Sequence, residues 1–280
     1  MSLSKRLAIK YFRAKFKLLS NLSKRKAAEK AFDLFCTPQY KNIKNLPPIF
    51  EKAEKLHFTI EDAIVRGYRW NHPGEKKLLI LHGFESTVIN FERYINPAIK
   101  KGYEVLAFDA PAHGHSSGKR ITVLTYKKMI GHIDTHYGPI TAFMAHSLGG
   151  LTVSLFLEEK EHDSSYKLVL IAPAAETTTA ANHFFSVLKL DGEVRKEFDQ
   201  LISEMNTQPS EWYSLVRAAK NIKAQVLFLQ DEDDEMTPMK DVKPIMAANY
   251  PNFKFIISKG LGHRRIYRDN KSFQSIIDFL

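Results

Sequence analysis

Short apolar runs alternate with segments of helical periodicity along most of this 280-residue chain. Apolar runs without a polar face are typical of strands that are buried on both sides of a sheet. We expect such strands at 78–81, 105–108, 140–144, 168–171, 226–229 and 253–257. Helical spacing lies between them at 91–101, 124–135, 148–158 and 242–249. This alternation predicts an α/β fold with a doubly wound, mostly parallel sheet.

Two stretches depart from this rhythm. Residues 55–60 and 63–70 alternate between apolar and polar on either side of an acidic turn, which predicts a hairpin. About fifty residues separate the strands at 168–171 and 226–229, more than one crossover helix needs. Helical patterns fill this interval at 180–188, 193–205 and 209–219. We therefore expect residues 175–221 to form a helical cap, inserted into a core made of 51–174 and 222–280.

Residues 1–50 are predicted to form a basic helical arm. On a helix over 3–22, Arg6, Lys10, Arg13 and Lys17 share one sector, and Leu7, Tyr11, Ala14, Leu18 and Leu22 share another. Residues 1–30 hold ten Lys/Arg and one acid, so +9 of the net charge of +10 lies there. The high charge is therefore a property of the arm and not of the rest of the chain.

Two partners for the arm remain open. In the simpler interpretation its apolar stripe packs on the domain; in the alternative, residues 3–26 lie on an anionic membrane. No nucleic-acid-binding motif accompanies the charge, so nucleic acid is not expected as a partner.

The remaining bulk properties favour a cytoplasmic protein, with peripheral membrane contact as the alternative. No apolar run is long enough to span a bilayer, and no signal peptide is apparent. Cys36 is the only cysteine, which excludes an internal disulfide, and we expect it to be a buried structural thiol. The sequence does not indicate an oligomeric state.

The segment Ala145-His146-Ser147-Leu148-Gly149 carries the main chemical signal. A predicted buried strand runs into a small-x-Ser-x-Gly turn and then a helix, a pattern that exposes the serine Oγ above the sheet edge. The backbone N–H of Leu148, at the start of that helix, would be one donor to a developing oxyanion. The second donor is expected from the loop His82-Gly83-Phe84 after another strand, at the N–H of Phe84. Ser147 is thus a candidate nucleophile.

A base and an acid are expected from loops near the end of the chain. His263 follows the last predicted strand in the glycine-flanked segment Gly260–His263, where it can reach back to Ser147. The preceding loop, 230–238, offers several carboxylates as the acid, among them Asp231, Asp233 and Asp234.

These motifs together resemble those of α/β-hydrolase fold serine hydrolases of the esterase and lipase type, from about residue 56 to the end. The family's acid commonly stands four residues before a proline, which implies Asp234, with Asp233 and Asp231 as alternatives. The order Ser147, Asp234, His263 is also the family's order. The loop 109–116 resembles the family's structural Asp-x-Pro-x-x-Gly-x-Ser loop. Departures are Ala145 in place of glycine, the acidic loop 231–235 and the basic arm.

No metal or other cofactor is expected. His113 and His115 form a His-x-His pair without the continuation of a metal motif, and the acidic loop lacks the spacing of a calcium loop. The Gly149-Gly150 pair lacks the spacing of a phosphate-binding loop or a dinucleotide fingerprint.

The expected function is hydrolysis of a carboxylester or thioester of a small acyl substrate through a Ser-His-Asp mechanism. A peptidase, a carbon–carbon bond hydrolase, or a small-molecule receptor on the same fold would share these residues. Candidate pocket residues are His82, His146, Phe184, Phe185 and Trp212. The aromatic residues of the cap could equally hold it to the sheet.

Overall fold

The computed structural model describes residues 3–41, 43, 45–206 and 208–280. The chain divides into two compact units. The smaller unit lies within Met1–Thr37 and Glu176–Tyr213, and the larger consists of Pro38–Ala175 and Ser214–Leu280. Each is described by itself.

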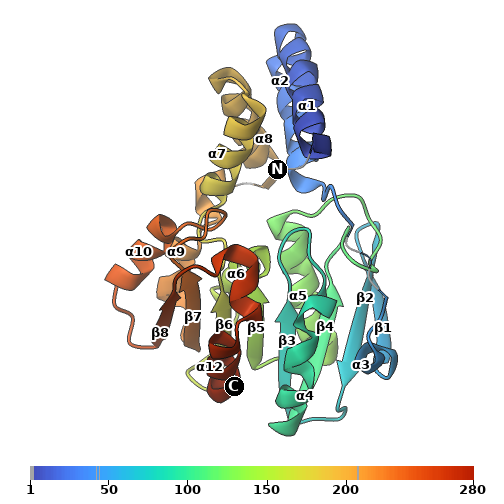
Figure 1. Ribbon diagram of the computed structural model, residues 1–280, viewed down its shortest axis with the longest axis vertical. Helices are drawn as coiled ribbons and strands as arrows, with labels where there is room; N and C mark the ends of the chain where they lie inside the picture. Colours follow the sequence, from blue (N-terminus) through green and yellow to red (C-terminus); the bar gives the residue numbers. More distant parts are fainter. Residues whose placement is uncertain (1–2, 42, 44, 207) are drawn as a thin grey trace. The chain divides into compact units, whose positions relative to one another are not determined.

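The larger unit is built on an eight-stranded sheet (Figure 1). Its strands are β1 (Glu54–Ile60), β2 (Ala63–Trp70), β3 (Lys76–Leu81), β4 (Tyr103–Asp109), β5 (Ala142–His146), β6 (Lys167–Ile171), β7 (Gln225–Asp231) and β8 (Phe253–Ser258). They lie in the order β1-β2-β4-β3-β5-β6-β7-β8. The β1–β2 and β2–β4 pairs are antiparallel and all others are parallel, which confirms the predicted mostly parallel sheet and its hairpin.

Helices cover both faces of this sheet (Figure 1). The helical segments are α3 (Pro48–Glu51), η1 (Val88–Phe91), α4 (Glu92–Lys100), α5 (Val123–Tyr137), α6 (Leu148–Leu157), α9 (Leu215–Ala218), η3 (Ala219–Asn221), α10 (Met239–Ala247), α11 (Gly262–Arg265), η4 (Ile266–Arg268) and α12 (Asn270–Phe279). α4 packs with α12, and α5 packs with α6. Because both faces are covered, every residue of β4 and β5 is buried, as the apolar runs predict.

The smaller unit is helical. It contains α1 (Leu3–Leu22), α2 (Lys24–Cys36), α7 (Thr177–Leu188), α8 (Gly192–Asn206) and η2 (Ser210–Trp212). The ring of Phe198 on α8 is the centre of its core, with ring centroids of Phe32, Phe35 and Phe185 at 6.0, 5.8 and 5.1 Å. Cys36, the only cysteine, is buried at the end of α2. The N-terminal helices therefore share a core with the helices inserted between β6 and β7.

Two boundaries differ from those expected. The predicted helix at 209–219 is split into η2, α9 and η3, because Tyr213 leaves the helical region at φ −80° and ψ 71°. Ser214 then caps α9 through the N–H of Arg217, and Leu215 donates to the carbonyl of Ala175. Residues 214–221 accordingly belong to the larger unit. Residues 38–50, predicted as part of the arm, also belong to the larger unit, where Phe50 packs edge-on against Tyr68 and Trp70.

The packing of the N-terminal arm differs from the simpler expectation. Leu7, Tyr11, Leu18 and Leu22, which were expected to pack on the domain, are all exposed. Phe16, on the other side of α1, is buried instead. Within the described ranges no helix is both long enough and apolar enough to cross a membrane.

Candidate active site

Ser147 stands at the turn between β5 and α6 in a conformation that few residues other than glycine adopt. Its φ is 53° and its ψ is −119°, and helix α6 begins at the next residue, Leu148. Neighbouring backbone crowds the turn. A Cβ on Gly149 would lie 2.8 Å from the carbonyl oxygen of His82, and one on Gly150 would lie 2.7 Å from Pro173 Cβ. The small residues after the serine are therefore required by the space available.

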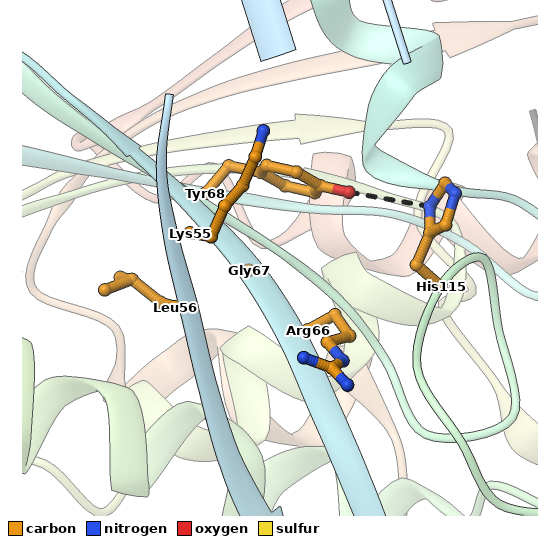
Figure 2. Close-up of a pocket in the computed structure, with 6 residues that line it drawn as sticks. All are labelled: Lys55, Leu56, Arg66, Gly67, Tyr68 and His115. Carbon is orange, nitrogen blue, oxygen red and sulfur yellow. Dashed lines mark hydrogen bonds between the residues drawn. The ribbon is translucent and has the colours of Figure 1, made fainter. Parts of the chain in front are cut away.

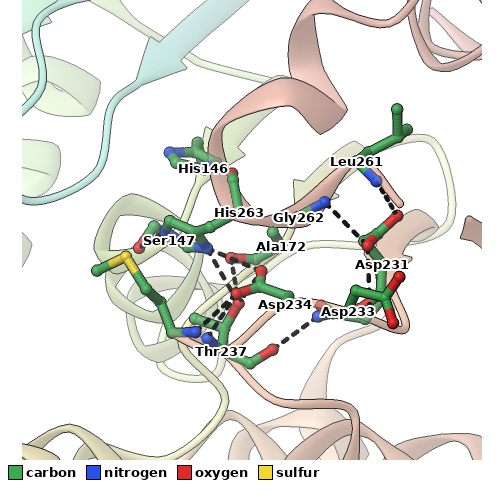
Figure 3. A network of polar contacts seen from close by, with 12 residues as sticks. His146, Ser147, Ala172, Asp231, Asp233, Asp234, Thr237, Leu261, Gly262 and His263 are labelled. Carbon is green, nitrogen blue, oxygen red and sulfur yellow. Dashed lines mark hydrogen bonds and ion pairs between the residues drawn. The ribbon is translucent and has the colours of Figure 1, made fainter. Parts of the chain in front are cut away.

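A chain of hydrogen bonds links the serine to a histidine and a carboxylate (Figure 3). His263 Nε2 lies 3.0 Å from Ser147 Oγ, and His263 Nδ1 lies 2.8 Å from Asp234 Oδ2. With the Nδ1 proton directed at the carboxylate, Nε2 is free to accept the serine proton. The side chains of His263 and Asp234 are only 8% and 0% exposed, so little water competes for these bonds. Three residues from separate loops are thus in contact.

Asp234 is held as a carboxylate by several donors. The N–H groups of Met236 and Thr237 donate to its Oδ1, and the Thr237 hydroxyl donates to its Oδ2 at 2.7 Å. Burial alone would raise the pKa of Asp234, but the hydrogen bonds and the nearby His263 outweigh it and hold the pKa below its usual value. Thr237 was not among the predicted site residues. Its position three residues after Asp234, directly before Pro238, is the only sequence signal for it.

The other two candidate acids bind the backbone of the histidine loop (Figure 3). Asp231 accepts from the N–H groups of Leu261 and Gly262 at 3.0 and 2.9 Å, and Asp233 accepts from Gly260 N–H at 3.0 Å. Neither contacts His263 Nδ1. The geometry therefore brings Asp234 to the histidine and uses Asp231 and Asp233 to fix the loop that carries it.

The two predicted oxyanion donors lie beside Ser147. A Cβ on Gly83 would stand 2.7 Å from Ser147 Cβ and 3.3 Å from its Oγ, which places the 83–84 backbone against the serine. Among the described residues, the N–H groups of Phe84 and Leu148 donate to no protein acceptor. Both are therefore available to a negatively charged oxygen.

Two buried histidines hold the loop that carries Phe84. His82 donates from Nδ1 to Gly83 O and accepts Ala110 N–H at Nε2. His113 donates from Nδ1 to Pro111 O and accepts Glu85 N–H at Nε2. Burial lowers the pKa of His82 and lowers that of His113 to about 3, so both act as neutral rings. His82 was expected at the pocket; it is instead fully buried with both nitrogens engaged.

His146, the residue before the serine, contacts the backbone of His263. Its Nε2 donates to the carbonyl oxygen of His263 at 2.9 Å, and its Nδ1 is buried without a protein partner in the described chain. Burial and the neighbouring His263 lower its pKa to about 3. His146 therefore helps to fix the backbone of His263.

The predicted aromatic pocket residues belong to the smaller unit. Phe185 is buried against Phe198, Phe184 packs edge-on against Phe35, and Trp212 packs on Tyr213. These contacts give them a role in the core of that unit, and a role in binding substrate stays a prediction.

A separate cavity of about 260 Å³ lies at β1 and β2 (Figure 2). It is lined by Lys55, Leu56, Arg66, Gly67, Tyr68 and His115, and none of the residues bonded to Ser147 is among them. Nor does His115 join a metal site: in the part of the chain that the structure describes, no three His, Cys, Asp or Glu side chains are grouped to hold an ion. This cavity is thus distinct from the hydrogen-bonded residues at Ser147.

The parallel sheet, the strained serine after β5 and the histidine after β8 define an α/β-hydrolase fold protein. Comparison with known protein families identifies the family within this fold. The chain belongs to the hydrolase family described as serine aminopeptidase, S33, whose profile matches residues 72–230.

Individual relatives match only part of the chain or match it at low sequence identity. An uncharacterized hydrolase of Bacillus subtilis, YugF, is 30% identical over 119 residues, which cover 41% of this chain and 42% of that protein. The chain thus matches less than half the length of this relative. The structure of the Pyrococcus furiosus esterase Pf2001 has a TM-score of 0.64 at 20% identity, covering 86% of this chain and 94% of that one. The alpha/beta hydrolase domain-containing protein 10 from mouse has a TM-score of 0.59 at 18% identity, covering 81% and 96%. Both structures share the fold.

Proposed function

We propose that this protein is a serine hydrolase that cleaves a carboxylester or thioester through an acyl-enzyme. The observation that carries the proposal is the continuous hydrogen-bonded chain from Ser147 through His263 to Asp234, with contacts of 3.0 and 2.8 Å. Hydrogen-bond contact between nucleophile and base, with the base oriented by a third group, is the arrangement that activates a serine.

Each group then has a defined task. Ser147 Oγ attacks the carbonyl carbon and its proton moves to His263 Nε2, while Asp234 stabilises the imidazolium. The N–H groups of Phe84 and Leu148 bind the oxyanion, each contributing about 3 kcal/mol to lowering the barrier. His263 returns the proton to the leaving alcohol or thiol. It then takes a proton from water, which attacks the acyl-enzyme, and gives that proton to Ser147 Oγ as the bond to the serine breaks and the carboxylic acid leaves.

An ester or thioester is favoured over an amino-terminal peptide by the charges of the site. An aminopeptidase must bind a positively charged amine, which calls for an available carboxylate. The carboxylates that surround His263 are already bonded: Asp234 to the histidine, and Asp231 and Asp233 to the 260–262 backbone. The fold likeness to an esterase adds support. The family's description keeps the peptidase as the second candidate.

A substrate panel tests the proposal. Hydrolysis of p-nitrophenyl acyl esters, acyl thioesters and aminoacyl p-nitroanilides is compared at equal concentration, each with wild type and Ser147→Ala. We expect ester and thioester turnover that falls by ~10⁴-fold or more in the variant. Faster turnover of the anilides would instead support the peptidase. Tight retention of product with very slow turnover of every substrate would support the receptor alternative.

A further inference from the structure

One face of helix α1 is apolar and exposed. Leu7, Tyr11, Leu18 and Leu22 are 57%, 61%, 67% and 77% exposed. At 100° per residue they fall within a sector of about 60° on the helix. These four residues form the exposed stripe. Soluble proteins rarely align several large apolar side chains in solvent, so a stripe of this kind indicates a surface that meets a partner.

The opposite face already anchors α1 to the smaller unit. Phe16 lies on the far side of the helix from the exposed stripe and is only 3% exposed. The guanidinium of Arg13 donates from Nε and Nη2 to the carbonyl oxygen of Val187, at 2.9 and 2.8 Å, at the end of α7. Because one apolar face is already packed, the exposed stripe is a second apolar face that folding of the unit does not use.

Basic side chains border the exposed stripe. Arg6, Lys10 and Lys17 lie along one edge, and Lys15 lies along the other with its Nζ 5.9 Å from the Tyr11 ring centroid. Helix α1 contains six Lys/Arg and no Asp or Glu. Among the described residues, no ion pair joins these four side chains to an acid.

Two basic residues of the next helix, α2, do form ion pairs. Lys24 pairs with Asp191 at 2.6 Å and Arg25 pairs with Glu204 at 2.5 Å, both within the smaller unit. Two basic side chains of α2 are thus paired with acids of their own unit, whereas among the described residues the basic side chains around the exposed stripe are not.

We propose that the exposed stripe and its basic border bind the surface of an anionic lipid bilayer, with α1 lying in the plane of the interface. Leucine and tyrosine side chains enter the boundary between headgroups and acyl chains, and the flanking Lys and Arg meet the lipid phosphates. A second copy fits poorly, because pairing two stripes would bring together two helices of like charge. Nucleic acid would neutralise the charge but leave the leucines in water. This proposal is independent of the proposed hydrolase function.

Vesicle flotation with the full chain tests it. Wild type is expected to float with phosphatidylcholine vesicles containing about 30% phosphatidylserine, and to float much less with phosphatidylcholine alone or in high salt. L7Q/L18Q/L22Q replaces the three leucines of the exposed stripe, and K10Q/K17Q removes part of its border. Each is expected to lower the partition coefficient roughly tenfold or more.

Matched controls separate the surface from general effects. Met205→Gln removes a 50% exposed apolar side chain of the same unit, and K240Q/K243Q removes two exposed lysines of α10. Both are expected to bind like wild type. Circular dichroism and the melting temperature verify that every variant is folded.

Three results would overturn the proposal. One is a folded wild type that does not float with anionic vesicles. The second is equal binding by wild type and L7Q/L18Q/L22Q. The third is a wild-type dimer by light scattering that this variant converts to a monomer without any vesicle binding, which would make the stripe a contact between copies.

Discussion

Three carboxylates within four residues of chain have different partners. Asp234 bonds to His263 Nδ1, while Asp231 and Asp233 bond to the backbone of the loop before the histidine. Composition and spacing could not separate them, because all three lie at the end of the same strand, β7. The preference for Asp234 came from a proline four residues later, and only side-chain geometry distinguishes its contacts from those of its neighbours.

Amide substitution of these acids tests the assignment. Asp234→Asn keeps the size of the side chain but no longer favours the Nδ1–H tautomer of His263, so kcat on an ester should fall by ~10⁴-fold. Asp233→Asn replaces the charged acceptor of Gly260 N–H by a neutral one and should cost less than about tenfold. Steady-state kinetics of both variants measure the difference. A larger loss in Asp233→Asn would make the assignment of Asp234 wrong.

Buried neutral histidines predict a dependence of stability on pH. Burial lowers the pKa of His113 to about 3, whereas an unfolded histidine has a pKa of about 6.5. Between these values the unfolded chain binds more protons than the folded one. The free energy of unfolding must therefore fall as the solution is acidified, by up to about 1.4 kcal/mol per pH unit for each such histidine.

Urea unfolding between about pH 6.5 and pH 4.5 measures this slope. His113→Gln removes one titrating group, so its slope should be smaller than that of wild type by close to one proton, whatever its absolute stability. An unchanged slope would show that His113 is already protonated in the folded state.

At the scale of elements, apolar runs located the strands from β3 to β8 to within a few residues, and alternation of apolar and polar residues located the β1–β2 hairpin. Helix boundaries within the inserted segment were less predictable. The turn at Tyr213 interrupts a periodic pattern, and it is set by the Leu215 N–H bond to Ala175, some forty residues away in the chain. For α1, periodicity found an apolar stripe but could not show that Phe16, on the other side, is the residue that is buried.

A substitution in the loop after β3 tests the role of the Phe84 N–H. Gly83→Ala introduces a Cβ at 2.7 Å from Ser147 Cβ and 3.0 Å from His146 Nδ1, so the 83–84 backbone must move away from the serine. Displacing the Phe84 N–H should cost ~10²-fold or more in kcat. Gly131→Ala in α5 is the control, because its Cβ would meet only Phe156 at 3.9 Å. Equal kcat for both variants, measured on one ester, would contradict the role of the Phe84 loop.

At the scale of the whole molecule, charge and chemistry lie in different units. Residues 1–30 carry a balance of +9, whereas Ser147, Asp234 and His263 all belong to the larger unit. The sequence alone locates the charge, because the basic residues are contiguous in the chain.

Hydrolysis of a soluble ester should therefore not depend on the exposed stripe. L7Q/L18Q/L22Q is expected to keep kcat/KM on a short-chain p-nitrophenyl ester within about twofold of wild type, because all four side chains of the stripe project into solvent. Parallel assays of the two proteins at one salt concentration give the comparison. A large loss of turnover by a folded variant would show that the stripe serves the active site directly.

Covalent labelling by a fluorophosphonate tests whether Ser147 is an activated nucleophile. Intact-mass spectrometry of folded wild type and Ser147→Ala after the same exposure counts the adducts. We expect one adduct on wild type and none on the variant. A folded wild type that stays unlabelled, or a variant labelled to the same extent, would contradict it.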